Sequence, residues 1–386
     1  MKRFIYCLTV CCVLLTVTGM INVSSAEQRI TEISQTAESL EDVLELDSLY
    51  DSLPQSAKDS LTAMGIEQIG EGTLDSVTFS SIMNSIVSVV SEQSTGVFTS
   101  LCTVVAVILI YALFEGFAQS ITGDTLREIL SVVCALCLAC ALVVPATEVI
   151  DDAVVAVSTA SDFMLAFVPI MAAVLISCGR SITSSGYYAL MVAAAEGISQ
   201  LCDKTITPML NVFLGVSLCG TIVPQVNLSG ITGFFAKTVK WLLSFTFTIF
   251  SALLTFKTLI STSIDTVSTR AVRYTVSSFI PVVGTALAEA YKTVQGSVNI
   301  LKNGMGVFVI FAVGAVFLPV VIRLLLWLFS VNMCKTFAQI INLSLPAQML
   351  SGVSTVLSVL LAVIICIMAL YIISTALIIT VGGGAT

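Results

Sequence analysis

The chain of 386 residues is 57% hydrophobic and only 10% charged, with a formal net charge of −8. Soluble domains are usually about 25% charged, so this composition excludes a soluble globular protein and predicts a polytopic membrane protein. The sequence has no histidine, which excludes Ser-His-Asp triads, HExxH zinc sites and histidine-ligated haem. We therefore expect a protein that is not an enzyme and that binds no cofactor or metal ion.

The first 26 residues have the pattern of a secretory signal peptide. Lys2 and Arg3 precede an apolar run over 4–21, and small residues lead up to Ala26. The apolar run is long for a signal peptide, so an uncleaved membrane anchor is the alternative. Both interpretations place the residues from Glu27 onward outside the cytoplasm.

Residues 27–96 are predicted to form a small acidic segment, helical and extracytoplasmic, with thirteen acids against two bases. Apolar residues recur three and four positions apart over 30–44, and Ser56 with Asp59 resembles a helix start. An amphipathic stretch over 74–90 leads into the first membrane span. We expect this segment either to form a cap on the membrane domain or to dock a partner protein.

The rest of the chain, 97–386, is predicted to be an all-α membrane domain, because a spanning helix needs about twenty apolar residues. Two shorter stretches, 186–202 and 274–291, are ambiguous, so the prediction is seven spans, with nine as the upper limit. Lysine and arginine favour cytoplasmic loops, and seven spans place more of them there. Both counts put the C-terminus in the cytoplasm. The seven predicted spans are 97–118, 129–147, 154–177, 205–226, 239–262, 304–329 and 352–380.

The stretch Ser278–Lys292 holds a proline, a glycine, an acid and a base within apolar sequence. Pro281 suits the first turn of a helix, and Glu289 is spaced to pair with Lys292. We expect residues 274–303 to form a short helix that does not span the membrane, or a re-entrant one, followed by a basic cytoplasmic loop. That loop has two interpretations, a partner contact or a simple topological anchor.

Two segments of the sequence resemble each other. Phe167–Ser181 aligns without gaps on Phe279–Thr293, with a proline two residues after each phenylalanine. Paired proline-broken apolar segments are typical of transporter repeats that hold a binding site between them. The pattern predicts a candidate internal repeat, with chance similarity between apolar runs as the alternative.

Four ionisable side chains lie deep in apolar sequence. Each costs about 2.5–3.5 kcal/mol at the centre of a membrane helix, so each is expected to face protein or water. A proton or ion relay is the functional interpretation, and buried ion pairs or side chains reaching to the interface are the alternative. These buried-charge candidates are Asp162, Glu196, Lys257 and Arg323.

The stretch Thr269–Gly306 resembles the signature region of the stage III sporulation protein AE family of endospore-forming bacteria. The similarity extends over the chain as a signal, a short acidic ectodomain and a series of spans. The sequence departs from the family at Tyr291-Lys292, where an acid is expected. The matching residues are Arg270, Arg273, Tyr274, Phe279, Ile280, Pro281, Val282, Gly284, Leu301, Lys302, Asn303 and Gly306.

The resemblance implies a non-enzymatic subunit of a channel- or secretion-like complex in the mother-cell membrane around the engulfed forespore, required there for forespore development. Its implied partners are the other stage III sporulation A-set membrane proteins, including a secretion-type ATPase, and indirectly the forespore-side stage II sporulation protein Q. The sequence has no P-loop and no basic patch for nucleic acid. The alternative function is a stand-alone secondary transporter. The expected partner-contact residues are Arg270, Arg273, Phe279, Pro281, Gly284, Lys302 and Asn303.

Overall fold

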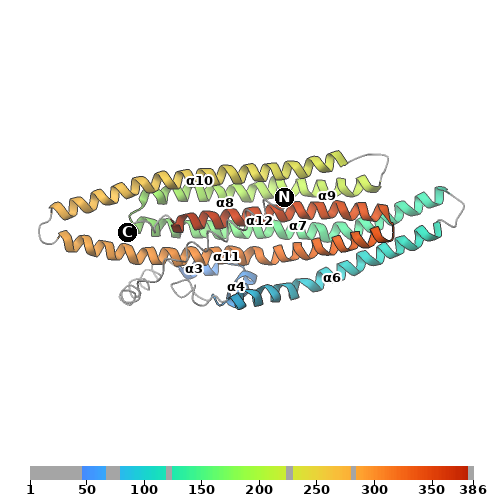
Figure 1. The fold of residues 1–386 in the computed structure, drawn as a ribbon, viewed down its shortest axis with the longest axis horizontal. Coiled ribbons are helices and arrows are strands. Elements are labelled where there is room, and N and C mark those ends of the chain that lie inside the picture. The colour runs from blue at the N-terminus through green and yellow to red at the C-terminus, as the bar shows by residue number, and fades with distance from the viewer. Residues whose placement is uncertain (1–45, 67–78, 119–123, 223–228, 280–283, 381–386) are drawn as a thin grey trace.

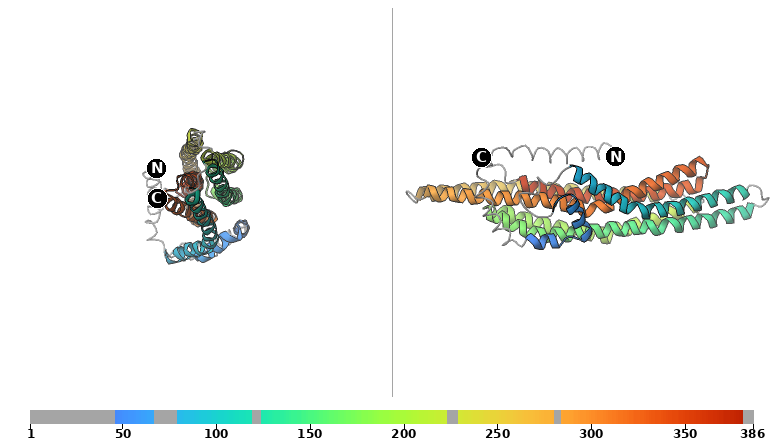
Figure 2. Two further views of the ribbon diagram at one scale, coloured as in Figure 1. Left: turned by 90° about the vertical axis from the view of Figure 1, so that its right-hand side faces the viewer. Right: turned by 90° about the horizontal axis from the view of Figure 1, so that it is seen from below.

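The computed structural model describes residues 46–66, 79–118, 124–222, 229–279 and 284–380. These residues form helices joined by turns and contain no strand, so the predicted all-α fold is confirmed. The long helices lie side by side along one axis and make an elongated bundle (Figures 1 and 2). Five of them are long and apolar enough to cross a membrane.

The long helices exceed the thickness of a bilayer. Helices α7, α10 and α11 contain 54, 51 and 57 residues, which makes each about 80 Å long at 1.5 Å per residue. The hydrocarbon core of a bilayer is about 30 Å thick. The described helices are α3 (Leu46–Asp51), α4 (Gln55–Ala63), α6 (Phe79–Ala118), α7 (Asp124–Ser177), α8 (Ser181–Leu201), the π-helical segment η2 (Cys202–Ile206), α9 (Thr207–Ile222), α10 (Ser229–Phe279), α11 (Gly284–Ile340) and α12 (Ser344–Thr380).

The five candidate spans are fewer than the seven predicted ones. The predicted spans 129–147 and 154–177 are two halves of the single helix α7. The acids between them do not break the helix, because Glu148 and Asp151 point to the surface and leave the backbone hydrogen bonds intact. The predicted span 205–226 falls mostly in α9, which has only 16 residues.

The segment 274–303 consists of the ends of two long helices. Helix α10 continues to Phe279, and α11 is helical from Gly284 onward, where the sequence predicts a short helix followed by a loop. Pro281 lies outside the described residues, as do the side chains of Glu289 and Lys292.

The two segments of the candidate repeat have different local structures. In the first, Pro169 lies inside α7, and the chain turns ten residues later at Gly179, whose φ is 75°. In the second, Phe279 is the last residue of α10 and Gly284 the first described residue of α11. The shared sequence pattern therefore does not give the two segments the same place in the fold.

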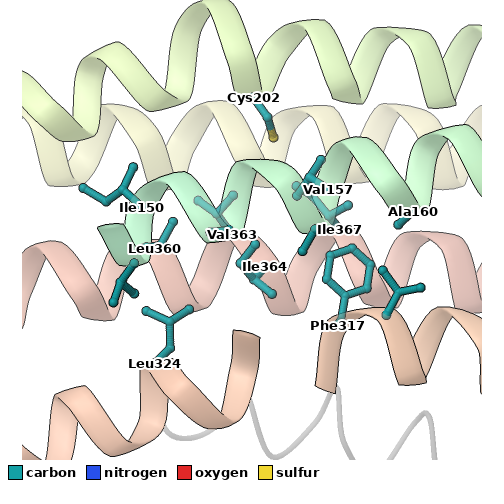
Figure 3. Close-up of a cluster of buried hydrophobic side chains, with 14 of the residues drawn as sticks. Ile150, Val157, Ala160, Cys202, Phe317, Leu324, Leu360, Val363, Ile364 and Ile367 are labelled. Carbon is teal, nitrogen blue, oxygen red and sulfur yellow. The ribbon is translucent and has the colours of Figure 1, made fainter. Parts of the chain in front are cut away.

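Helix α12 lies at the centre of the bundle and packs on α7, α9, α10 and α11. Its 37 residues contain no charged side chain, which is typical of a helix surrounded on all sides. Figure 3 shows its residues between those of α7 and α11. The labelled side chains from these three helices are Ile150, Val157, Ala160, Phe317, Leu324, Leu360, Val363, Ile364 and Ile367, all buried.

A widened turn joins α8 to α9. Pro208 lacks an N–H, so it cannot donate the usual helical hydrogen bond to the carbonyl four residues earlier. The helix widens into η2 just before this proline, and the Thr207 hydroxyl donates to the Cys202 carbonyl at 2.8 Å. Such π turns are common at functional positions. Here the turn lets α8 and α9 continue as one rod.

The short helices α3 and α4 pack against the bundle, mainly on α11 and also on α6 and α7. Leu49, Ala57 and Leu61 are at most 1% exposed, and the Tyr50 ring lies 6.3 Å from that of Phe308. Residues 46–66 are therefore placed as a cap on the bundle, with their polar side chains outward. The stretch 30–44 lies outside the described residues.

The cap is expected to come away from the bundle when its central apolar contact is lost. In Leu61→Asp, a carboxylate must be buried without a partner, which costs several kcal/mol. Limited proteolysis of the full chain in membranes should then cleave residues 46–66 at least ~10-fold faster. The neighbouring exposed position gives the control, Thr62→Asp, which should be cleaved like the unmodified protein. Equal cleavage of both variants would show that the cap does not depend on this contact.

Candidate functional site

An interhelical ion cluster lies near the middle of the bundle. The Arg323 guanidinium on α11 donates to the Asp152 carboxylate on α7, and its second terminal nitrogen lies 3.6 Å from Glu148 Oε2. Glu148 and Asp152 are four residues apart, so they share one face of α7. Of the two interpretations for Arg323, the structure places it in an interhelical ion pair.

The ion cluster borders a cavity of about 300 Å³ between α4, α6, α7 and α11. This volume is large enough for several water molecules. Pro319 lies inside α11 beside it and leaves one backbone carbonyl of that helix without its usual donor. The cavity therefore has a partly polar lining, which suits water or a small polar solute. The polar residues lining it include Ser56, Gln93, Asp152, Thr159 and Arg323.

The other three buried-charge candidates are exposed on the surface of the chain. Asp162 lies on α7 and Glu196 on α8, and the Ser184 hydroxyl bond to the Ala172 carbonyl fixes how these helices pair. Asp162 lies ten residues before Ala172 and Glu196 twelve residues after Ser184. The two acids therefore lie at similar heights on the α7–α8 hairpin. Lys257, on α10, packs over α8, with its Cε 3.0 Å from the point where a Cβ on Gly186 would lie.

The signature residue Lys302 is buried rather than presented to a partner. It is 1% exposed, and its Nζ donates to the Ile379 carbonyl at 3.1 Å. One turn further on, a Cβ on Gly306 would collide with the Ile379 side chain. This glycine and lysine hold α11 against the last turn of α12, because a cation suits the free carbonyls of a helix C-terminus.

The remaining signature residues divide into two groups. Arg270 on α10 and Asn303 on α11 are exposed. The side chains of Arg273, Phe279, Pro281 and Gly284 lie outside the described part of the chain. Among the described candidates, Arg270, Lys302 and Asn303 are not brought together with Arg323.

Asp265 holds a position that the sequence analysis does not single out. It is 4% exposed on α10, and its two carboxylate oxygens accept the backbone N–H groups of Ile182 at 3.1 Å and Thr183 at 2.7 Å. These are orphan donors of the first turn of α8, which Arg180 at its own N-cap does not satisfy. An acid also suits the positive end of the helix dipole. Asp265 therefore caps α8 from a neighbouring helix.

The interface between α8 and α10 around Asp265 is incompletely hydrogen-bonded. Among the buried side-chain atoms of the described residues, the hydroxyls of Thr183, Tyr187 and Thr262 have no hydrogen-bond partner. An unsatisfied buried hydroxyl costs about 1–3 kcal/mol. Asp265 therefore joins α8 to α10 in an interface where three buried hydroxyls lack partners.

In the described part of the chain, no group of three or more His, Cys, Asp or Glu side chains is placed so that it could hold a metal ion. Four cysteines there are exposed, namely Cys102, Cys137, Cys140 and Cys219. The arrangement as a whole offers interhelical charge pairing, a cavity large enough for several water molecules and exposed charges on long apolar helices.

Comparison with known proteins identifies relatives of the chain. A family model described as stage III sporulation protein AE matches residues 63–382. A curated protein of that description from Bacillus subtilis (strain 168) is 22% identical over 158 residues, which is 41% of this chain and 40% of the relative. The alignment therefore spans less than half of that protein. No solved structure matches the chain.

Removal of the Asp265 cap should loosen the first turn of α8. In Asp265→Ala the two amides lose their acceptor, at a cost of about 1 kcal/mol. Hydrogen exchange should then be about five-fold faster at the amides of Ile182 and Thr183. Ser263→Ala, which removes an exposed hydroxyl bonded only to its own helix, should leave their exchange unchanged. Unchanged exchange in Asp265→Ala as well would refute the cap.

The ion cluster should contribute modestly to stability, because its members are part exposed. Arg323→Met is expected to cost about 1 kcal/mol and to lower the unfolding midpoint in detergent by about 2–4 °C. Exposed Arg270→Met should have no such effect. The exchanged pair, Arg323→Asp with Asp152→Arg, should regain part of the loss. If the exchanged pair is no more stable than Arg323→Asp alone, the two side chains do not interact as described.

Proposed function

We propose that this chain, which belongs to the stage III sporulation protein AE family, is an integral membrane subunit of the channel- or secretion-like complex that joins mother cell and forespore. Family membership gives the chain a role in sporulation, and its long apolar helices make it a membrane protein. The complex, and the requirement for it in forespore development after engulfment, are the proposed part.

The observation that carries the proposal is a set of charges exposed on the surface of the bundle. Asp162, Glu196 and Lys257 are exposed when the chain is considered alone. Facing hydrocarbon would cost each about 2.5–3.5 kcal/mol, so these surfaces must meet protein or water. A subunit of a larger membrane assembly meets this requirement, because neighbouring subunits cover such surfaces or enclose water.

The proposed location is the mother-cell membrane around the forespore. The proposed partners are the other stage III sporulation A-set membrane proteins, including a secretion-type ATPase, with the forespore-side stage II sporulation protein Q as an indirect partner. The exposed Arg270 and Asn303 remain the described signature residues open to such contacts. A contact through Lys302 would require the end of α12 to move away.

A stand-alone secondary transporter is the second candidate, and one observation favours it. The cavity beside Arg323 is bounded by three bundle helices and by α4 of the cap, and transporters also bind their solutes between helices. A transporter of this kind would act in growing cells and without other sporulation proteins.

Deletion of the gene in its own host separates the two candidates. Membrane-stained microscopy of sporulating cells should show complete engulfment followed by forespores that stall and shrink, with normal vegetative growth. Normal spores together with a solute-dependent growth defect would contradict the complex and favour the transporter.

The exposed charges should matter for assembly. The double variant Asp162→Asn and Glu196→Gln, re-introduced into the deletion strain, should reach the membrane in normal amounts but co-purify less of the other stage III sporulation A-set proteins. Spore yield should fall in parallel. Ser185→Ala, an exposed change of similar size on α8, is the matched control. Undiminished co-purification in the double variant would remove the observation that carries the proposal.

A further inference from the structure

We propose that the bilayer surrounds only one half of the bundle, so that the chain enters it as three hairpins, α6–α7, α9–α10 and α11–α12, each of which returns to the side from which it entered. The other half then stands in water on the same side as α3 and α4. This inference concerns the lipid-contacting surface and holds whether or not the chain belongs to a channel complex.

A belt of charges divides the bundle across its middle. The cavity lining shows that Gln93, Asp152 and Arg323 lie at one height, which places the adjacent Glu92 there too. Along the bundle axis, Figure 3 shows Cys202 between Ile150 and Val157, so η2 lies at the same height. We call these residues the middle belt: Glu92, Glu148, Asp151, Asp152, Asp203, Lys204 and Arg323.

One side of the middle belt has the dimensions of a bilayer. Helix α6 has 22 residues without charge between Glu92 and Glu115, and α7 has 19 between Glu128 and Glu148. At 1.5 Å per residue these runs are about 33 and 29 Å long, close to the hydrocarbon thickness of about 30 Å. We call this side the membrane half. It comprises 93–118, 124–147, 207–222, 229–239, 324–340 and 344–360, and the opposite side is the outer half.

The exposed surface of the membrane half is apolar around the bundle. Large apolar side chains are exposed there on α6, α7, α9, α10 and α11. Trp241 on α10 is 63% exposed at the edge of the middle belt and stacks on Phe245 at 5.2 Å, as aromatic side chains do at membrane interfaces. The exposed residues include Phe98, Leu113, Val133, Leu136, Val212, Phe234, Phe329 and Met333.

Apart from Arg127, which lies near the start of α7, two bases fall within the membrane half. Each of them has a polar neighbour or a route to the interface. Lys335 is half-buried and donates to the Ser351 hydroxyl at 3.0 Å. Lys237 lies one turn from Trp241, so its flexible side chain can carry the ammonium group to the membrane–water interface.

The surface of the outer half carries exposed charged side chains, which are rare on surfaces that face lipid. Asp162, Glu196, Lys257 and Arg270 are exposed on three of its helices. Large apolar side chains are exposed there as well, mostly on α10 and at isolated positions on α7, α8 and α11, but the four charged residues lie among them. This mixture suits water or protein and not hydrocarbon.

The cap gives independent support. Helices α3 and α4 cover α11 near Phe308 and beside the cavity at Arg323. Their outward side chains include Asp51, which is 79% exposed, and Asp59. A helix with such a surface does not lie in hydrocarbon, so the part of the outer half beneath it is in water.

All three hairpins turn at the same end of the bundle, where α6, α9 and α11 end and their partner helices begin (Figure 1). The end of α12 lies at the opposite end, together with the α7–α8 turn. Three hairpins that each return to the side of entry therefore put the end of α12 on the same side as the cap. The seven predicted spans put them on opposite sides, with Arg270 and Lys302 in the cytoplasm.

The native cysteines make the placement testable. All four exposed cysteines of the described residues, Cys102, Cys137, Cys140 and Cys219, lie in the membrane half. In hydrocarbon a thiol does not form the reactive thiolate. The full chain, reconstituted in permeabilised vesicles of phosphatidylcholine and phosphatidylglycerol, is treated with a charged maleimide, and each site is read by mass spectrometry.

We expect these four thiols to stay unlabelled until detergent and denaturant are added. Ser185→Cys and Val267→Cys, both exposed in the outer half, should be labelled at once, and Phe329→Cys in the membrane half should not. The buried Cys178 and Cys202 report that the chain is folded, since they should also stay unlabelled. Labelling of the four native thiols, or protection at positions 185 and 267, would overturn the placement.

Sealed vesicles of one orientation test the number of crossings. A reagent that labels Asp59→Cys on the cap from one side should label Thr380→Cys at the end of α12 from that same side. Labelling of the two positions from opposite sides would support an odd number of spans and overturn the arrangement of three returning hairpins.

Discussion

The constraint on which the rest of the structure depends is that α7 does not break at its acids. Glu148, Asp151 and Asp152 lie in the middle of a helix of 54 residues, and Arg323 from α11 pairs with two of them. Because the helix continues, its acids lie at the same height as charges on the neighbouring helices. The middle belt, the polar cavity and the position of the cap all follow from that continuity.

Much of the fold could be predicted from the sequence because it depends on local composition. The all-α membrane class, the helix that begins near Ser56 and an amphipathic stretch that leads into the first span follow from apolar periodicity. The number of spans does not, because three clustered acids indicate a loop as readily as a charged surface on a long helix. Only the pairing with Arg323, 171 residues away, shows which of the two is present.

The candidate site shows the same division between local and distant information. Arg323 could be picked out as a costly charge in apolar sequence, but its partners lie on another helix. Lys302 fits a surface motif by sequence and is instead buried against the end of α12. Asp265 caps a helix whose first turn is 82 residues away, so no local pattern marks it. Together these contacts give an elongated bundle whose outer half carries charges that suit protein partners or water.

The most direct test of this account is a distance along α7. Spin labels are placed at two exposed positions, Leu136→Cys and Ile176→Cys, in an otherwise cysteine-free chain in lipid nanodiscs. Pulsed electron–electron double resonance then measures the distance between the two labels. One continuous helix predicts a separation of about 60 Å, from 40 residues at 1.5 Å each. Two spans that reverse direction near Glu148 would bring the labels to within about 25 Å. That result would contradict the continuous helix and with it the middle belt.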